Sequence, residues 1–385
     1  MEVLREDEIG SFQMEDFTEF GIKFYKLIGL NMIPQRRTTW KEKLFQIFKS
    51  FLFVTFFLNI FLIEASMMIF VFKNSNDLSL IARVLPHVIN LPYVVIKILY
   101  QYINRDKVAE IQGSLNEIFP KTRKEQNIFG TKNYVDELRK FTKIYGTVLV
   151  VGFTAFIFKG IVILFISKTN ELPTSLWTPF HYERGIAFIP FLLWIYYIVW
   201  TKIIGSFAAE ITLYTMVTLF SMSFDILRYK CEHIEMGESK LEDDELKQIK
   251  DIIIEHNKIL ELSKEWENIF STFFLINFLQ SSFFLCFIVF LMLSNGGMML
   301  NYVPYLFAAL SQTILICFLG QKMIDSSSSV GIGILNTELF NSRNTKMKQA
   351  ILLIVLKSQK PSVLTMKKFG AISIETFTKV IEKYF

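Results

Sequence analysis

Long apolar runs separated by charged segments dominate the chain. The clearest of them is residues 270–293, which contains no Asp, Glu, Lys or Arg. A helix needs about 20 apolar residues to cross the hydrocarbon core of a bilayer. A soluble helix of this length would show a polar face, and this run has only scattered Ser, Thr, Asn and Gln. The run therefore predicts a helix that crosses a membrane.

Hydropathy predicts seven such segments along the chain. They are residues 44–72, 78–100, 144–166, 185–209, 270–293, 302–319 and 369–385. The last segment is the weakest, because it is short and carries Glu375, Lys379, Glu382 and Lys383. Placing these charges against lipid costs a large free energy. The segment therefore either faces protein and water or is not a span, and a chain of six spans is the alternative.

Lys and Arg gather in alternate connections between these segments. The N-terminal segment and the second–third and fourth–fifth connections are rich in them, and the other connections are poor. Because basic residues stay on the cytoplasmic side, the pattern predicts a cytoplasmic N-terminus and, with seven spans, an extracellular C-terminus. This orientation is the reverse of that of a G-protein-coupled receptor.

Two heptad patterns flank the fourth–fifth connection. Apolar positions follow spacings of four and three residues at Phe220, Phe224, Leu227, Cys231 and Ile234, and again at Leu246, Ile249, Ile253, His256 and Leu260. Such stripes must be buried on another helix. We expect the fourth and fifth spans to extend into the cytoplasm and pack together, joined by a helix at about residues 346–357 that ends before Pro361. An oligomer contact and a loop folded on its own chain both fit this pattern.

Composition narrows the class of protein. The chain has 385 residues, of which 52% are hydrophobic, a mean hydropathy of +0.37 and a net charge of +5. No basic patch with interleaved aromatic residues indicates nucleic-acid binding. Three cysteines, two of them in apolar runs, do not suggest a disulfide scaffold. No catalytic or metal-binding motif is evident, so we predict neither an enzyme nor a cofactor. Glu255-His256 is interpreted as a solvated helix face, and the run Ser326–Ser329 as a polar helix face or a turn.

Polar residues inside the second span share one helical face. They are Arg83, His87, Asn90, Lys97 and Gln101. Intramembrane polar residues usually face the bundle interior or a water-filled cavity. A hydrated cleft that opens outward is one interpretation, and a buried structural network or snorkelling at the span ends is the other. Lys159, in the third span, has Glu210 or Glu64 as its expected partner. The aromatic residues of the outer half suit a small volatile or lipid-like ligand.

The C-terminal region resembles a known family. Cys317-Phe-Leu-Gly320-Gln-Lys-Met-Ile324 and Asn336-Thr-Glu-Leu-Phe340 are similar to the sixth helix of insect odorant receptors. Residues 352–361, together with Leu364-Thr365, Phe369-Gly370 and the segment 373–380, resemble that family's final helix pair. About the last 70 residues carry this motif resemblance, and the remainder matches by layout.

The resemblance implies an all-α, polytopic membrane fold with seven transmembrane helices. The expected organisation is a cytoplasmic segment (1–43), four ligand-binding spans (44–209), cytoplasmic extensions (210–268), spans five and six (269–319), anchor helices (320–362) and a short pore-lining helix (363–385). It also implies a subunit of a tetrameric, odorant-gated, non-selective cation channel in the plasma membrane of olfactory neurons. The short fourth–fifth connection resembles that of a tuning subunit, whose partners are the shared co-receptor, a small volatile hydrophobic ligand and membrane lipid.

The resemblance also assigns residues. The odorant pocket is expected among His87, Phe156, Gly160, Phe188, Phe191, Tyr302 and Tyr305. The pore is expected to be lined by Ser373, Thr376, Phe377, Val380 and Ile381. Family members usually continue beyond the equivalent of Tyr384-Phe385, where the resemblance places the hydrophobic gate. A shortened pore-lining helix and an incomplete or variant gene product both fit this difference, and partner subunits are one source of the gate.

Three other classes of protein fit the sequence less well. A gustatory-type receptor channel would end in a Thr-Tyr…Gln-Phe pattern, which this chain lacks. A transporter would favour internal repeats and helices broken at the membrane midplane. A G-protein-coupled receptor conflicts with the distribution of basic residues.

Overall fold

The computed structural model describes residues 11–32, 40–166, 172, 174–180, 188–234, 242–294, 299–337 and 345–384; within these helices a few side chains lie outside the described part. The helices are α1 (Met14–Leu27), α2 (Trp40–Lys73), α3 (Leu78–Ile103), α4 (Arg105–Asn116), α5 (Arg123–Ile128), α6 (Thr131–Ile166), α7 (Phe188–Glu232), α8 (Glu242–Ser294), α9 (Met299–Leu335), α10 (Thr345–Ser358) and α11 (Ile374–Tyr384). Within the described residues, the only β-pairing is an isolated bridge between Thr365 and Ala371. The predicted all-α, polytopic membrane fold is confirmed.

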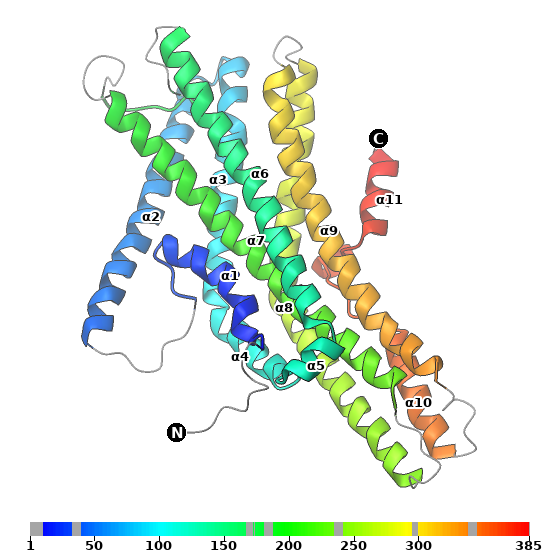
Figure 1. Ribbon diagram of the computed structural model, residues 1–385. Helices are drawn as coiled ribbons and strands as arrows, with labels where there is room; N and C mark the ends of the chain where they lie inside the picture. Colours follow the sequence, from blue (N-terminus) through cyan, green and yellow to red (C-terminus); the bar gives the residue numbers. More distant parts are fainter. Residues whose placement is uncertain are drawn as a thin grey trace.

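Long helices that run along one another form the body of the protein, and the shorter helices α4, α5 and α10 lie toward one end of it (Figure 1). Within the described residues, five segments are long and apolar enough to cross a membrane: Ser50–Lys73, Val84–Ile103, Thr131–Phe158, Phe188–Glu232 and Glu245–Leu293. They correspond to the first five predicted spans. The predicted sixth span, residues 302–319, lies within α9.

The predicted seventh span is wrong in its helical extent. Residues 367–369 form a 3₁₀ turn, and Gly370 follows with a φ of 138°. This left-handed backbone region favours glycine and interrupts the helix. The helix α11 therefore begins only at Ile374 and contains 11 residues, a length of about 16 Å.

Helices α7 and α8 are much longer than a membrane requires. They contain 45 and 53 residues, lengths of about 68 and 80 Å, whereas a bilayer core is about 30 Å thick. Their extensions pack along the predicted seam, with Phe220, Phe224 and Leu227 buried against Ile249 in one cluster. Their lengths and shared seam agree with the prediction of paired helices that continue beyond the membrane; the cytoplasmic position of these extensions stays a prediction.

His256 lies in this seam, which corrects one sequence interpretation. Its side chain is 1% exposed and meets the edge of the Phe224 ring at 6.5 Å between ring centroids. The predicted solvated face is wrong because His256 occupies a heptad position, and its spacing from Ile249 and Leu260 turns it inward. The neighbouring Glu255 remains on the outer side and pairs with Lys230 at 2.7 Å.

Helix α10 joins the extensions as predicted. Met347, Ile351 and Ile354 are buried on it, and it packs against α8 and α9. The serine run lies within α9, where the Ser327 hydroxyl accepts a hydrogen bond from the Ser362 amide at 2.9 Å. The serine run is thus a polar helix face that holds the segment after α10.

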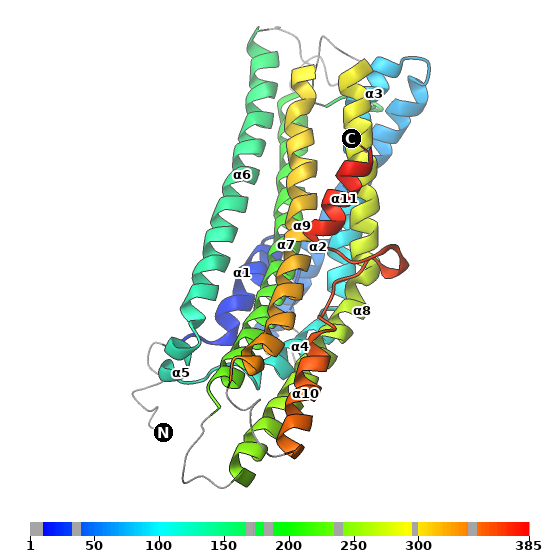
Figure 2. The ribbon, with the colours of Figure 1, turned by 90° about the vertical axis from the view of Figure 1, so that its right-hand side faces the viewer.

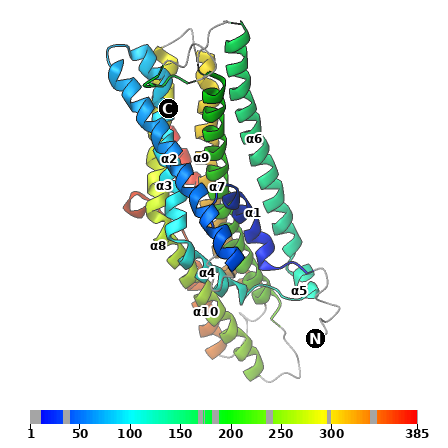
Figure 3. The ribbon, with the colours of Figure 1, turned by 90° about the vertical axis from the view of Figure 1, so that its left-hand side faces the viewer.

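The amphipathic helix α1 packs beside α7 in the half of the bundle nearer α4 and α5, as Figure 3 shows from the side of α2 and α6. Gly21 allows this close approach, because a Cβ there would lie 2.4 Å from the Thr212 hydroxyl of α7.

A surface ion pair joins α8 to the end of α4. Lys258 of α8 donates to Glu117, which follows α4, and this hydrogen bond holds the pKa of the Glu117 carboxyl below its usual value.

Candidate functional site

A buried ion pair lies at the centre of the bundle. Lys97 of α3 donates to the carboxylate of Glu210 of α7, and neither side chain is exposed. Sequence reasoning left Lys159 to pair with either Glu210 or Glu64, and left Lys97 in a hydrated cleft, in a buried structural network or snorkelling at the span end. The structure pairs Glu210 with Lys97, because α3 and α7 pack together and place the two groups at the same depth. The side chain of Lys159 lies outside the described part.

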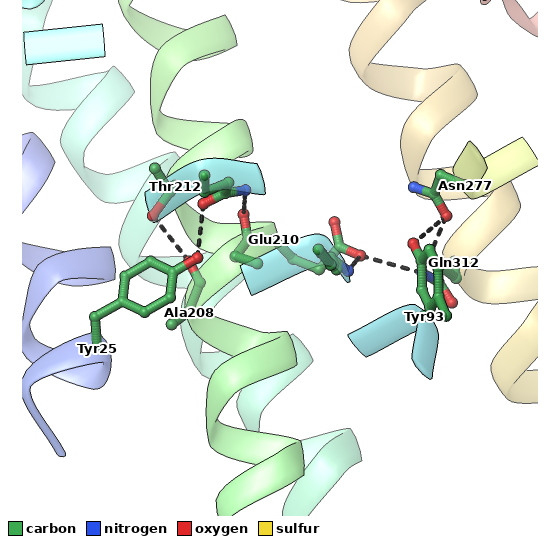
Figure 4. Close-up of polar contacts among 10 residues, drawn as sticks. Tyr25, Tyr93, Ala208, Glu210, Thr212, Asn277 and Gln312 are labelled. Atoms are coloured by element: carbon green, nitrogen blue, oxygen red, sulfur yellow. Dashed lines mark hydrogen bonds and ion pairs between the residues drawn. The ribbon is translucent and has the colours of Figure 1, made fainter. Parts of the chain in front are cut away.

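Two side-chain amides and one hydroxyl extend this pair across two more helices. The Gln312 Nε2 of α9, which carries two hydrogens, lies within hydrogen-bond distance of three acceptors: Glu210 at 3.3 Å, the Asn277 amide oxygen of α8 at 3.3 Å and the Tyr93 hydroxyl of α3 at 3.0 Å. The Tyr93 hydroxyl also donates to Asn277. Figure 4 shows Tyr93, Gln312 and Asn277 converging on one another. We call Tyr93, Lys97, Glu210, Asn277 and Gln312 the central network; it ties together α3, α7, α8 and α9.

A second set of polar contacts joins α1 to α3 and α7, one helical turn along α3 from Lys97. The Tyr25 hydroxyl donates to the Gln101 side chain at 2.7 Å, and Gln101 donates to the Ala209 carbonyl at 3.0 Å. For Lys97 and Gln101, the interpretation as a buried structural network is therefore correct, and a hydrated outward cleft is wrong. His87 and Asn90, nearer the other end of α3, are half-buried, and the side chain of Arg83 is outside the described part.

The predicted ligand residues of α6 and α7 are associated with different faces of α7. Phe188 is buried, and Phe191 packs beside it in a cluster with α2 and α3. Phe191 stacks on Trp194 with ring centroids 5.4 Å apart. Phe156 of α6 instead meets Tyr196 edge-on at 5.9 Å. Positions 191 and 196 point away from each other on a helix, so Phe156 is not gathered with the other two phenylalanines.

For the remaining predicted ligand residues, the structure gives only the helix on which each one lies. Gly160 lies in α6, and Tyr302 and Tyr305 lie in α9; their side-chain surroundings fall outside the described part. The set of seven ligand residues stays a prediction.

The predicted pore residues lie on and before α11. The Ser373 hydroxyl accepts a hydrogen bond from the Thr376 amide at 3.1 Å, which caps the first turn of α11. Phe377, Val380 and Ile381 follow in α11, with side chains outside the described part. In Figure 2, α11 lies along α9 and near α8, on the side of the bundle away from α2.

Two cavities adjoin these groups. A cavity of about 20 Å³ lies under the start of α11, among α8, α9 and residues 366–376. A larger one of about 210 Å³ opens among α1, α3, α4, α7 and α8, with Gln101 and Arg105 in its wall. Arg105 is held there by a hydrogen bond of 2.9 Å to the Asn31 carbonyl.

Sequence reasoning missed Tyr93, Asn277 and Gln312. Asn277 and Gln312 were visible as polar residues inside otherwise apolar spans. Such residues usually contact another polar group on a neighbouring helix. That rule identifies them as candidates, although it does not name their partners.

These features define a multi-pass helical membrane protein in which two helices extend beyond the bilayer and a short helix packs on one side of the bundle. A family profile described as "7tm Odorant receptor" matches residues 77–384. The match covers most of the chain, which therefore belongs to the odorant receptor family. The predicted membership of the insect odorant receptor family is confirmed.

Individual relatives agree with this assignment. The chain is 24% identical to putative odorant receptor 92a of Drosophila melanogaster, over 98% of this chain and 94% of that protein. It is 25% identical to odorant receptor 85b of the same organism, over 71% and 72%. Among solved structures, the fold is similar to that of the insect olfactory receptor OR5 from Machilis hrabei, with a TM-score of 0.79, 13% identity and coverage of 95% and 94%. It is also similar to that receptor in complex with eugenol, with a TM-score of 0.77 at the same identity and coverage.

Proposed function

We propose that this odorant receptor is the ligand-binding subunit of a heteromeric, odorant-gated, non-selective cation channel. Its partner is a shared co-receptor subunit, and its place is the plasma membrane of an olfactory neuron, with the N-terminus in the cytoplasm and the C-terminus outside. Membership of the family and the eugenol complex of the similar insect receptor support a small odorant as the ligand.

One observation carries the assembly part of this proposal: α10 is apolar on both faces. Its inner face is buried, and Leu352, Leu353 and Leu356 on its outer face are about half exposed. Ile254 of α8 and Ile332 of α9, on the two helices that α10 packs against, are also exposed. We call these five residues the outer apolar face. Exposed apolar patches of this kind are typical of protein or membrane contacts.

The depth of α10 favours a protein contact over lipid. The Lys357 ammonium of α10 donates to the Asn257 side chain of α8. Asn257 precedes the charge-free run that starts at Phe270 by about 20 Å of helix. The intervening residues of α8 include Lys258, Glu261, Lys264 and Glu265, which are unsuited to the hydrocarbon core. The outer apolar face therefore lies below the bilayer, where neighbouring subunits are its natural cover.

The position of α11 supports a role beside an aqueous path. It packs on α9 and exposes Glu375 and Lys379, which pair with each other at 2.5 Å, and Glu382. These charges are unsuited to lipid, and water in a shared pore accommodates them. In this proposal Phe377, Val380 and Ile381 line the pore. Ser373, which is buried in the single chain, and Thr376, which borders the cavity against α8 and α9, belong to the same predicted set and lie at the foot of the pore-lining helix.

The ligand acts by shifting an equilibrium. An odorant held between the outer halves of α3, α6, α7 and α9 favours the open channel only by its greater affinity for that state. Pocket shape sets selectivity, because one methylene in an apolar pocket changes the binding free energy by about 1–3 kcal/mol.

The test is electrical recording from cells that express this chain with an insect co-receptor, across a panel of volatile odorants. Co-receptor alone and this chain alone are the controls, and surface labelling confirms delivery. We expect odorant-evoked cation current when both subunits are present, and little or none with either subunit alone. Confirmed surface delivery of both subunits without any current across a broad panel would contradict the proposal.

A further inference from the structure

Two hydrogen bonds fasten the first turns of α6 to α7. The Tyr214 hydroxyl of α7 donates to the Glu137 Oε1 of α6 at 2.7 Å. The Tyr134 hydroxyl of α6 donates to the Asp225 carboxylate of α7 at 2.6 Å. Tyr134 and Glu137 lie one turn apart on α6, and Tyr214 and Asp225 lie three turns apart on α7, so each pair shares one face of its helix.

Lys322 of α9 joins this contact from a third helix. Its ammonium donates to the same Glu137 Oε1 at 2.6 Å. It also lies over the Tyr214 ring at 5.6 Å and the Tyr134 ring at 6.0 Å from the ring centroids, where a cation is attracted to the ring faces. The Lys322 side chain is 15% exposed and that of Glu137 is 41% exposed. Glu137 therefore connects α6 to both α7 and α9.

Lys322 lies opposite the point where α9 meets the chain before α11. Gly320 precedes Lys322 by two positions, and residues two apart point in nearly opposite directions from a helix. A Cβ at Gly320 would lie 2.1 Å from the Ile372 carbonyl oxygen, so the segment that leads into α11 runs directly against α9 there. The same turn of α9 thus contacts α6 on one side and this segment on the other. Figure 2 shows α9 standing between α6 and α11 in that view.

Beyond this contact α6 packs along one side only. Ile144, Val148 and Val151 are 55%, 57% and 61% exposed. Aromatic pairs such as Phe153 with Trp200, with ring centroids 4.9 Å apart, attach this part of α6 to α7. A helix with few buried contacts is free to tilt at a small cost in free energy. Any tilt of α6 on α7 reaches α9 through the charge-assisted hydrogen bond between Glu137 and Lys322.

We propose that Glu137 is a positioning residue for gating. Through Lys322 it makes α9 follow the movements of α6, and α9 holds the segment that leads into α11. Glu137 contacts neither the odorant nor the ion path in this proposal, so loss of its bond to Lys322 weakens the coupling between the two sites. This inference rests on the proposed channel function.

Two single substitutions test the coupling. Lys322→Met removes the charge and keeps an unbranched side chain over the tyrosine rings, and Glu137→Gln keeps an acceptor for Tyr214. Because Glu137 is partly exposed, water solvates its carboxylate when Lys322 is replaced, and the variant should fold. In cells with the co-receptor, we expect each change to raise the half-maximal odorant concentration by about 2- to 10-fold, the range for one partly exposed hydrogen bond to a charged group.

The matched control is Asp136→Asn. Asp136 is the neighbouring acid on α6 and forms an exposed pair with Arg139 at 3.5 Å, so its replacement should leave the half-maximal concentration unchanged. Surface labelling sets all variants to the same receptor level. A half-maximal concentration that stays at or falls below that of the unsubstituted receptor in Lys322→Met or Glu137→Gln would overturn the proposal.

The double variant distinguishes a direct contact from two independent effects. Glu137→Gln combined with Lys322→Met should raise the half-maximal concentration no further than the larger of the two single changes. Shifts that multiply in the double variant would show that the two residues act separately, and the coupling through this bond would then be wrong.

Thermal unfolding of the detergent-solubilised receptor supplies a test that does not depend on current. The losses of melting temperature in the two single variants should not add in the double variant, as expected for two groups in contact. Additive losses would refute the contact. Non-additive losses with unchanged odorant sensitivity would leave a purely structural contact and overturn the role in gating. If the melting temperatures show the contact but the unsubstituted receptor and its co-receptor pass no odorant-evoked current, the proposed channel function fails instead.

Discussion

Lys97 and Glu210 form an ion pair in which both side chains are completely shielded from solvent. The two residues lie on α3 and α7, 113 positions apart in the chain. Two opposite charges at this depth stabilise the bundle only together, since removal of either partner leaves the other as an uncompensated buried charge. The pair therefore fixes the register of α3 against α7 more than it adds net stability.

The first prediction concerns this pair. Lys97→Met alone and Glu210→Gln alone should each destabilise the receptor, by about 3–5 kcal/mol for an isolated buried charge. Because the double variant removes both charges and keeps similar side-chain volumes, it should recover most of that loss. The measurement is the temperature at which half of the detergent-solubilised receptor loses its monodisperse chromatographic peak.

A matched control for this pair is Lys379→Met, since Lys379 forms an exposed pair with Glu375. Exposed pairs contribute about 0–1 kcal/mol, so this change should leave the melting temperature nearly unchanged. Additive losses in the double variant of Lys97 and Glu210 would show that the two residues do not interact in the folded receptor.

The contrast between local and distant patterns explains what the sequence could predict. The seam of α7 and α8 was predictable because its spacing is a property of each helix alone, and Phe220, Leu227 and Ile249 all lie in it as expected. The partner of Glu210 was not predictable, because Lys159 and Lys97 offer the same charge in apolar spans. Only the packing of α3 on α7 distinguishes them.

The C-terminal helix shows a different limit. Hydropathy merged residues 369–385 into one span, although Gly370 and Ser373 are typical of a break and an N-cap. The structure has both features, with the Thr376 amide bonded to Ser373.

For the ligand pocket, apolar aromatic residues such as Phe156 and Phe191 were visible in the sequence. Their orientation was not, because α7 presents aromatic residues on several faces.

The second prediction concerns the approach of the C-terminal segment to α9. At Gly320 a Cβ would lie 2.1 Å from the Ile372 carbonyl oxygen, which is backbone and cannot rotate away. Gly320→Ala should therefore displace the segment that leads into α11, at a cost of about 1–3 kcal/mol. We expect loss of most odorant-evoked current at a normal surface level.

Gly152→Ala is the matched control for Gly320→Ala. It lies within α6, and a Cβ there meets nothing within 4 Å among the described residues. The same gain in helix propensity applies at both sites, so a difference in current between the two variants isolates the steric contact. Normal current in Gly320→Ala would show that this contact is not needed for gating.

The third prediction concerns orientation. The basic residues before α2 and in the connection from α3 to α6 predict a cytoplasmic N-terminus. An epitope tag at the N-terminus should bind antibody only after cells are permeabilised, whereas a tag after Phe385 should be accessible on intact cells. An N-terminal tag accessible on intact cells would contradict the proposed topology and, with it, the cytoplasmic position of α10.

The last prediction concerns the outer apolar face. A leucine that becomes fully buried gains about 1.5–3 kcal/mol from the hydrophobic effect, so a contact on Leu352, Leu353 and Leu356 would stabilise an assembly substantially. Replacing all three with Ser should release subunits from the oligomer, as measured by native mass or by size-exclusion chromatography in detergent. Because these side chains are exposed on the single chain, the melting temperature of the released subunit should change little. The control is Ile351→Ser on the buried face of the same helix, which should instead lower the melting temperature and the yield. If the triple variant remains a tetramer with the unsubstituted co-receptor, α10 does not hold the subunits together, and another surface must do so.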